Sequence, residues 1–182
     1  MATIQLNNSP VHSDSIITAI YGDTGSMWSC GFHTGLDFAS YSGESNPMLY
    51  SCCIGEVVEV NLTPSASLGN NVVIRDTNGK YFRYCHMVTG SVQVSVGDQV
   101  NLSTPIGQMG DTGNVTGIHL HLEYATTQGW NCNTFLDPAG YFGVTFARGD
   151  IVEYSGSPTP PTHKGNAKKW LMAKAKRINI RF

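Results

Sequence analysis

Four of the six histidines of this chain lie in short polar settings that favour chemistry over simple packing. They are His33 in GFHTGLDF, His86 in RYCHM, and His119 and His121 in GIHLHLEY. Side chains on a strand alternate between its two faces, so His119 and His121 project to one side, about 6.5–7 Å apart, while Leu120 and Leu122 face the core. A lone histidine is more often a packed or surface residue, but a pair on one strand face indicates a metal or proton-transfer site.

Catalytic zinc sites use three protein ligands drawn from His, Asp and Glu, and leave a fourth position for water. The H-x-x-x-D spacing of His33 and Asp37 supplies two such ligands, and one histidine of the H-x-H pair supplies the third. H-x-x-x-D alone is a weak motif whose simplest interpretation is a surface pair. It gains weight together with H-x-H and with His86 in a Y-x-H. Spacing does not decide between His119 and His121 as the ligand.

The elements that must position these side chains are mainly strands. Hydrophobic residues form 41% of the 182 residues, charged residues only 13%, and there are 20 glycines, so the chain is poor in helix formers and rich in turn formers. Short β-rich runs occur at residues 15–21, 56–62, 70–76, 80–87, 92–96 and 118–125. Asn78-Gly79 between two of them predicts a β-hairpin. We predict an all-β fold, a compact and mostly antiparallel sheet with little helix.

Other residues near these motifs allow two interpretations each. The loop at residues 110–117, GDTGNVTG, lacks the Lys and the helix of a phosphate-binding P-loop, so we expect no nucleotide cofactor. Its glycines are expected to turn tightly beside a cleft and to approach an extended peptide. Glu123 is either an outer partner of a ligand histidine or a solvated strand residue. Four aromatic residues line the groove or pack in the core: Trp28, Tyr41, Tyr84 and Trp130.

The charge changes sign along the chain. Residues 1–162 carry all 13 Asp and Glu against four Lys and Arg, about −9, whereas residues 163–182 carry seven Lys and Arg. A Pro/Ser/Gly/Thr stretch at residues 155–162 separates the two parts. We predict one globular domain at 1–154, a linker at 155–162 and a basic amphipathic tail at 163–182.

The tail from Lys164 to Phe182 has three possible roles. It binds an anionic polymer or a membrane surface, docks on a partner protein, or is a disordered terminus. Nucleic acid is a minor alternative, because the rest of the chain is acidic.

Five cysteines, an odd number without C-x-x-C spacing, are expected to be mainly reduced, partly buried thiols. The first residues show neither a basic n-region nor an apolar h-region, and no run of about 18 apolar residues occurs. We therefore expect synthesis in a cytoplasm without a Sec signal, and no membrane span.

The motifs together resemble the M23 family of zinc metallopeptidases, the lysostaphin-like peptidoglycan endopeptidases. In that family an H-x-x-x-D, a Y-x-H and an H-L-H occur in this order, separated by a strand with a glycine turn and by a G-x-T-G-x-x-T-G loop. The resemblance covers about residues 17–142, and all of these motifs are present: FHTGLDFA, PMLYSCCIGEVVEV, NNVVIRDTNGKYFRYCHM and VSVGDQVNLSTPIGQMGDTGNVTGIHLHLEY.

The resemblance implies a lysostaphin-type fold with one Zn²⁺ per chain. It assigns His33, Asp37 and His121 as the zinc ligands and His86 and His119 as the catalytic pair. Bound zinc lowers the pKa of water towards about 7 and polarises the scissile carbonyl.

The implied activity is hydrolysis of peptide bonds in the stem or cross-bridge of bacterial peptidoglycan. We expect a phage-encoded enzyme of wall lysis or penetration, which reaches the wall by holin-type release or as part of a virion. The alternative is a non-catalytic peptidoglycan-binding or structural tail-tip module with an M23-like fold. The complete ligand set argues against it, because degenerate members lose one or more of these positions.

Overall fold

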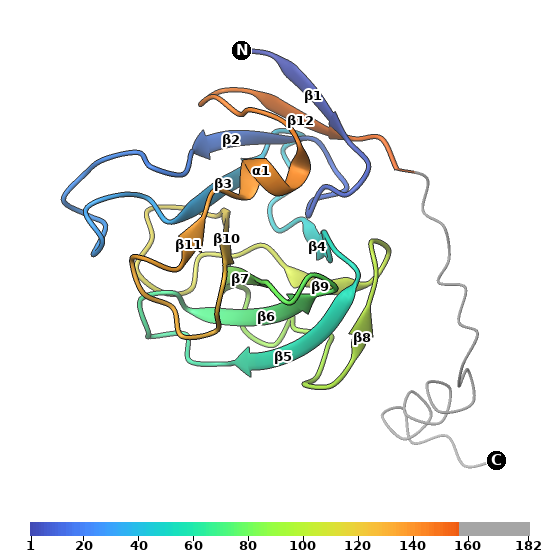
Figure 1. The fold of residues 1–182 in the computed structure, drawn as a ribbon. Helices are drawn as coiled ribbons and strands as arrows, with labels where there is room; N and C mark the ends of the chain where they lie inside the picture. Colours follow the sequence, from blue (N-terminus) through green and yellow to red (C-terminus); the bar gives the residue numbers. More distant parts are fainter. Residues whose placement is uncertain (157–182) are drawn as a thin grey trace.

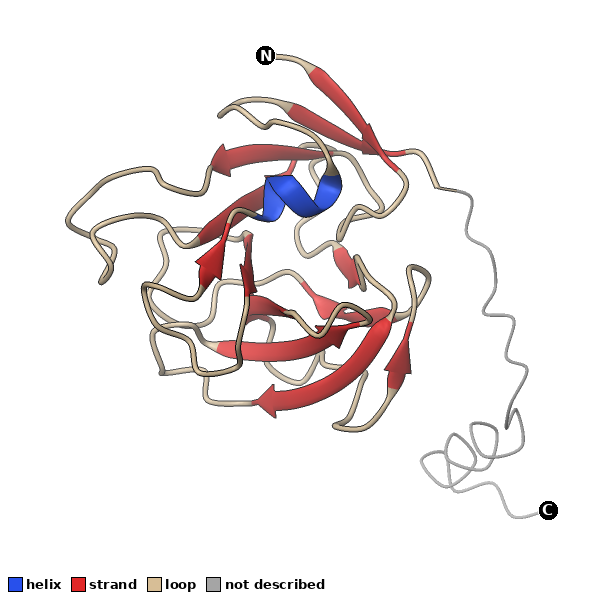
Figure 2. Ribbon diagram, in the orientation of Figure 1, coloured by secondary structure: helices blue, strands red, loops and turns tan. Residues whose placement is uncertain are grey.

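Strands dominate the computed structural model, which describes residues 1–156 (Figure 2). In chain order the elements are β1 (Thr3–Leu6), β2 (Ser15–Ala19), β3 (Gly35–Ser40), β4 (Met48–Tyr50), β5 (Gly55–Asn61), β6 (Asn70–Asp76), β7 (Tyr81–Met87), β8 (Gln99–Val100), β9 (Pro105–Gln108), β10 (Leu120–Ala125), β11 (Phe135–Leu136), α1 (Pro138–Phe142) and β12 (Ile151–Tyr154). The all-β prediction is confirmed. The short α1 is capped by Asp137, whose side chain accepts from the Ala139 N–H.

Most of the strands of the described part of the chain form one sheet, in the order β1-β12-β2-β3-β10-β7-β6-β5-β8, with β11 paired to β10. The neighbours are antiparallel, apart from the parallel pair of β1 and β12 that brings the first and last described strands side by side (Figure 1). β4 and β9 form a second, small sheet. The prediction of a mostly antiparallel sheet is confirmed.

The predicted hairpin is formed by β6 and β7. The Asp76 carboxylate accepts from the backbone N–H groups of Asn78 and Lys80, and Gly79 adopts a φ of 76°. Only Gly79 needs the left-handed conformation, which glycine adopts without steric cost. The turn therefore depends on Asp76 as much as on Asn78-Gly79.

β10 lies between β3 and β7, at the centre of the sheet. Its residues alternate as expected: Leu120 and Leu122 are fully buried in the core, whereas His121 and Glu123 face the other side, where they line a groove. Tyr84 on β7 is also fully buried, and its hydroxyl accepts from the Cys52 N–H at 2.7 Å. Tyr84 is therefore a core residue and not part of the groove.

One predicted strand is wrong. Residues 92–96 alternate in the sequence like a strand, yet they belong to no strand of the structure. Gln93 donates a single backbone hydrogen bond to Ile106, and the Asp98 side chain accepts from the Ser95 N–H. The Asp98 side chain thus closes a turn directly after this one ladder contact, so pairing stops.

No helix among residues 1–156 has the length and apolar character needed to span a membrane. β12 ends at Tyr154. The predictions for the tail, and for the linker from residue 157 onwards, lie outside the described residues.

Candidate metal centre and groove

His33 ends the loop that connects β2 to β3, and this loop closes on itself. The His33 backbone N–H donates to Asp23, and its carbonyl accepts from Gly22. The ring is 1% exposed and lies with Nδ1 3.0 Å from the Ile20 carbonyl. A carbonyl can only accept, so Nδ1 carries the proton and Nε2 is left as an acceptor that points away from the loop.

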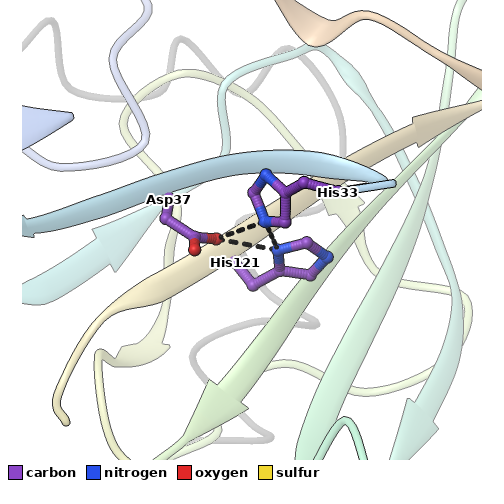
Figure 3. A group of neighbouring side chains, drawn as sticks. All are labelled: His33, Asp37 and His121. Carbon is purple, nitrogen blue, oxygen red and sulfur yellow. Dashed lines mark hydrogen bonds and ion pairs between the residues drawn. The ribbon is translucent and has the colours of Figure 1, made fainter. Parts of the chain in front are cut away.

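Asp37 and His121 lie directly opposite each other on β3 and β10. The Asp37 Oδ1 lies 2.8 Å from His121 Nδ1 and 3.1 Å from His33 Nε2, and the two ring nitrogens are 2.9 Å apart (Figure 3). One possible ligand atom from each residue lies within 4.8 Å of the others. Three residues that are 4 and 84 positions apart in sequence thus converge on one point.

The electrostatics of this cluster suit a cation. Burial alone would raise the pKa of the Asp37 carboxyl, but hydrogen bonds from His121 and His33 hold it well below its usual range. Burial would likewise lower the pKa of His121, yet hydrogen bonds and charges from Asp37 and Glu123 raise it to about 9. The cluster therefore holds positive charge strongly. Two imidazole nitrogens and one carboxylate oxygen are also a donor set that zinc accepts.

His86 and His119 lie beside the cluster. Their ring centroids are 4.9 Å apart, and His119 Nε2 is 3.8 Å from Asp37 Oδ2. Nδ1 of His86 lies 2.9 Å from the Thr112 carbonyl and Nδ1 of His119 lies 2.9 Å from the Gly117 carbonyl. Both rings therefore carry the proton on Nδ1 and present Nε2 as an acceptor. Burial lowers the pKa of His86 to about 4, against the Thr112 hydrogen bond, so this ring is neutral at pH 7.

His86 is the only non-glycine residue with a positive φ, 62°, in the described part of the chain. Its backbone N–H donates to Leu68, which lies in the loop before β6. Such a conformation is rare for a residue with a side chain and is retained where the surroundings impose it. The loop at residues 110–117 imposes it from the other side through Thr112.

The profile of peptidase family M23 matches residues 31–134, which include all five of these side chains. The chain belongs to peptidase family M23. Members of this family are zinc-dependent peptidoglycan hydrolases. The family resemblance read from the sequence is thereby confirmed.

Relatives of the M23 domain come from phage and bacteria. Endolysin 2638A of Staphylococcus phage 2638A is 37% identical over 98 residues, which are 51% of this chain and 19% of that protein. The peptidoglycan DD-endopeptidase ShyA of Vibrio cholerae is 40% identical over 91 residues, 50% of this chain and 20% of that protein. The chain spans about a fifth of the length of the curated relatives it matches.

Solved structures show the same fold. The catalytic domain of lysostaphin from Staphylococcus simulans matches with a TM-score of 0.61 and 25% identity, over 71% of this chain and 92% of that domain. A zinc-containing peptidase from Vibrio cholerae matches with a TM-score of 0.56 and 28% identity, over 72% of this chain and 38% of that protein. The lysostaphin-type fold predicted from the sequence is confirmed.

A groove of about 890 Å³ is lined by the five side chains described above: His33, Asp37, His86, His119 and His121. Trp28 and Trp130 line this groove, as the sequence allowed, whereas Tyr41 is an exposed residue outside it. Residues 114–117 of the glycine loop also line the groove. The glycine at position 113 has a φ of 91°, and a Cβ there would lie 2.5 Å from the Ser67 carbonyl oxygen. Loop-to-loop packing thus requires this glycine, and the expected approach of the loop to a substrate stays a prediction.

A disulfide that the sequence did not predict lies in the wall of the groove. Cys30, three residues before His33, is bonded to Cys132 in the loop between β10 and β11. The expectation of reduced thiols is wrong for these two residues and confirmed for the buried, free Cys52, Cys53 and Cys85. A pairing across 102 positions has no local sequence signal, because only the fold brings the two loops together. Both cysteines line the groove.

Thr34 and Arg83 near the centre were not identified from the sequence, which also left two interpretations of Glu123. Thr34 and Arg83 contact Glu123, which is 1% exposed, so Glu123 is not a solvated strand residue. Burial would raise the pKa of Glu123, but the His121 hydrogen bond and the His121 and Arg83 charges lower it to about 2. Glu123 is thus a buried carboxylate beside the cluster.

Proposed function

We propose that this chain is a zinc metalloendopeptidase that hydrolyses peptide bonds of bacterial peptidoglycan, with His33, Asp37 and His121 as the zinc ligands. The observation that carries the proposal is the convergence of Nε2 of His33, Nδ1 of His121 and Oδ1 of Asp37 inside the groove of an M23 domain. Without a metal, His121 Nδ1 holds a proton between Asp37 Oδ1 and His33 Nε2, and a bound cation would take the place of this proton.

Zinc in this site would polarise the scissile carbonyl and promote the ionisation of water at neutral pH. The chain contributes the proton transfers. His86 and His119 each present an unprotonated Nε2, because their Nδ1–H groups are used by backbone carbonyls. One ring accepts a proton at Nε2 from the attacking water and then delivers the same proton to the leaving amine. The other ring takes a proton from solvent at Nε2 and then donates a hydrogen bond to the oxyanion.

The proposed substrate follows from the groove and from the relatives. An open groove of about 890 Å³ accommodates an extended peptide. The names of the relatives include a phage endolysin and peptidoglycan DD-endopeptidases. We take the stem or cross-bridge peptide as the substrate and wall lysis or penetration by a phage as the biological setting. The basic tail from Lys164 to Phe182 would add contacts with an anionic wall polymer, a membrane surface or a tail protein.

The test is release of new amino groups from purified peptidoglycans with different cross-bridges. The zinc-loaded protein should release amines from at least one wall type, and His119→Ala should lower the rate by about 10²–10⁴-fold while the protein keeps its metal. Binding to the wall without amine release from any type would contradict the proposal and favour the non-catalytic wall-binding module.

A further inference from the structure

Glu123 follows His121 by two residues on β10, so both side chains lie on the groove side of the sheet. Its carboxylate oxygen Oε1 lies 3.2 Å from Nε2 of His121 and accepts from the Thr34 hydroxyl at 2.6 Å. Nε2 is the ring nitrogen that does not face the metal cluster. Glu123 therefore contacts the edge of the His121 ring that faces away from the cluster.

The second carboxylate oxygen is held by another strand. Arg83 lies directly opposite Glu123 on β7, and its Nε donates to Oε2 at 2.6 Å, with a further contact from its terminal nitrogen. The Arg83 guanidinium in turn lies over the ring of Trp130, 3.9 Å from the centroid. Trp130 belongs to the loop that carries Cys132 of the disulfide. A continuous set of contacts thus runs from the groove wall to His121.

From these contacts we propose that Glu123 is a positioning residue for His121. Its Oε1 keeps a proton on Nε2, so that Nδ1 faces His33 and Asp37 as a metal-binding nitrogen, and the contacts of Arg83 fix the carboxylate. The inference rests on the proposed zinc site and adds to it the group that sets the orientation of one ligand. Partners of this kind typically change metal affinity by about 10–100-fold when they are removed.

The chemistry of the contacts explains why a carboxylate stands here. Every neighbour donates: His121 and Thr34 to one oxygen, Arg83 to the other. A glutamine has one acceptor and one donor end, so its amide N–H₂ must face either Arg83 or His121. If it faces His121, the proton leaves Nε2 for Nδ1, and the metal-binding lone pair is lost.

The structure offers a matched control. Glu56 on β5 and Arg75 on β6 are also direct neighbours, 3.1 Å apart, in the same sheet. Their side chains are 37% and 48% exposed, and neither lines the groove. Glu56→Gln therefore removes one carboxylate from the same kind of Glu–Arg pair in the sheet without touching the metal cluster.

The test measures zinc affinity by competition with a chelator. Glu123→Gln should bind zinc about 10–100-fold more weakly than the natural protein, and Glu56→Gln should bind it equally well. Glu123→Gln combined with Arg83→Met lets the amide oxygen turn to His121 and should therefore bind zinc more tightly than Glu123→Gln alone, within about threefold of the natural protein. A cobalt-loaded sample should show a changed visible spectrum for Glu123→Gln alone.

A second measurement needs no variant that might unfold. In the natural protein the His121 Nε2–H should give a ring proton signal that is protected from exchange with water, with or without zinc. Equal zinc affinity of Glu123→Gln and the natural protein, or a rapidly exchanging Nε2–H, would overturn the inference. If the natural protein itself binds no zinc, the proposed function fails instead, so the two failures are distinguishable.

Discussion

Three histidines of the centre are oriented in the same way. His33, His86 and His119 each lie with Nδ1 about 3 Å from a backbone carbonyl, those of Ile20, Thr112 and Gly117. This leaves Nε2 as the acceptor in all three rings. His121 is reversed, with Nδ1 facing the cluster and Nε2 facing Glu123. The protonation pattern of the centre is therefore set by the loop backbone and one carboxylate.

His12 does not line the groove, and its burial leads to a prediction about the pH dependence of stability. Its ring is stacked between Tyr50 and Tyr154, at 3.7 Å from each centroid. Burial lowers the pKa of His12 from 6.5 to about 4, although a backbone hydrogen bond with Leu102 opposes the shift. Below pH 6.5 His12 binds a proton in the unfolded chain, whereas in the folded chain it binds one only near pH 4. Stability from this group is therefore lost as the pH falls through this window.

His12→Phe keeps an aromatic ring in the stack and cannot be protonated. We expect its free energy of unfolding to fall less than that of the natural protein between pH 7 and pH 4. Because the ring is only half buried, solvent screening reduces the difference to on the order of 1 kcal/mol. Denaturant titrations at several pH values measure it, and parallel pH curves for the two proteins would refute this account of His12.

The candidate site could be read from the sequence only in part. The spacings of His33 with Asp37 and of His119 with His121 indicated most of the side chains that converge, and strand alternation supplied the reason for the second pair. The choice of His121 over His119 as the third member of the cluster followed only from the family resemblance. The roles of Thr34 and Arg83 depend on contacts across strands, which one sequence does not contain.

At the scale of elements, the centre depends on the pairing of β3 with β10, which sets Asp37 opposite His121. Gly35 on β3 permits this close approach, because a Cβ at this position would lie 2.3 Å from the Leu122 carbonyl oxygen. We expect Gly35→Ala to destabilise the protein by about 1–3 kcal/mol and to weaken zinc binding, because the two strands must separate.

Gly140→Ala is the control for this prediction. Gly140 lies in α1, and a Cβ there meets nothing within 4 Å. Alanine should stabilise this helix by about 0.5–1 kcal/mol and leave the metal site unchanged. Thermal unfolding and zinc titration of both variants provide the comparison. Equal effects of the two substitutions would show that the close approach of β3 to β10 does not determine stability or zinc binding.

The disulfide joins the loop of His33 to the loop after β10 across 102 residues. Closing a loop of about 100 residues is worth about 4.7 kcal/mol in the chain-entropy model, with about 2–4 kcal/mol typical of measured bridges. The double variant Cys30→Ala, Cys132→Ala should therefore unfold at a markedly lower temperature. A reducing phosphine should lower the Tm of the natural protein equally and that of the double variant not at all. An unchanged Tm on reduction would mean that the bridge is absent in solution.

The fold was predictable where local chemistry decides it. Asn78-Gly79 indicated the β6–β7 hairpin, and the alternation in residues 118–125 indicated β10. The parallel pairing of β1 with β12 joins residues 3–6 to residues 151–154, which no local pattern encodes. The prediction of a strand at residues 92–96 was wrong because an alternating sequence forms a strand only where a neighbouring strand continues to pair with it.

For the whole molecule, a zinc ion would connect a loop to two central strands. Binding of zinc to the folded state alone stabilises it by about 4.1 kcal/mol when free zinc exceeds the Kd a thousandfold. We expect the Tm to rise with added zinc and to fall with a chelator, and His121→Ala to abolish both responses. Thermal scans at several zinc concentrations measure the effect. A Tm that is independent of zinc would oppose a site inside the fold.

Zinc content after dialysis tests the central claim most directly. It should be measured for the natural protein and four variants: His33→Ala, Asp37→Ala, His121→Ala and His119→Ala. The account predicts one zinc per chain in the natural protein and in His119→Ala, and a loss of bound zinc in the other three. A natural protein without zinc, or ligand variants that retain it fully, would contradict the assignment of His33, Asp37 and His121 as the metal centre.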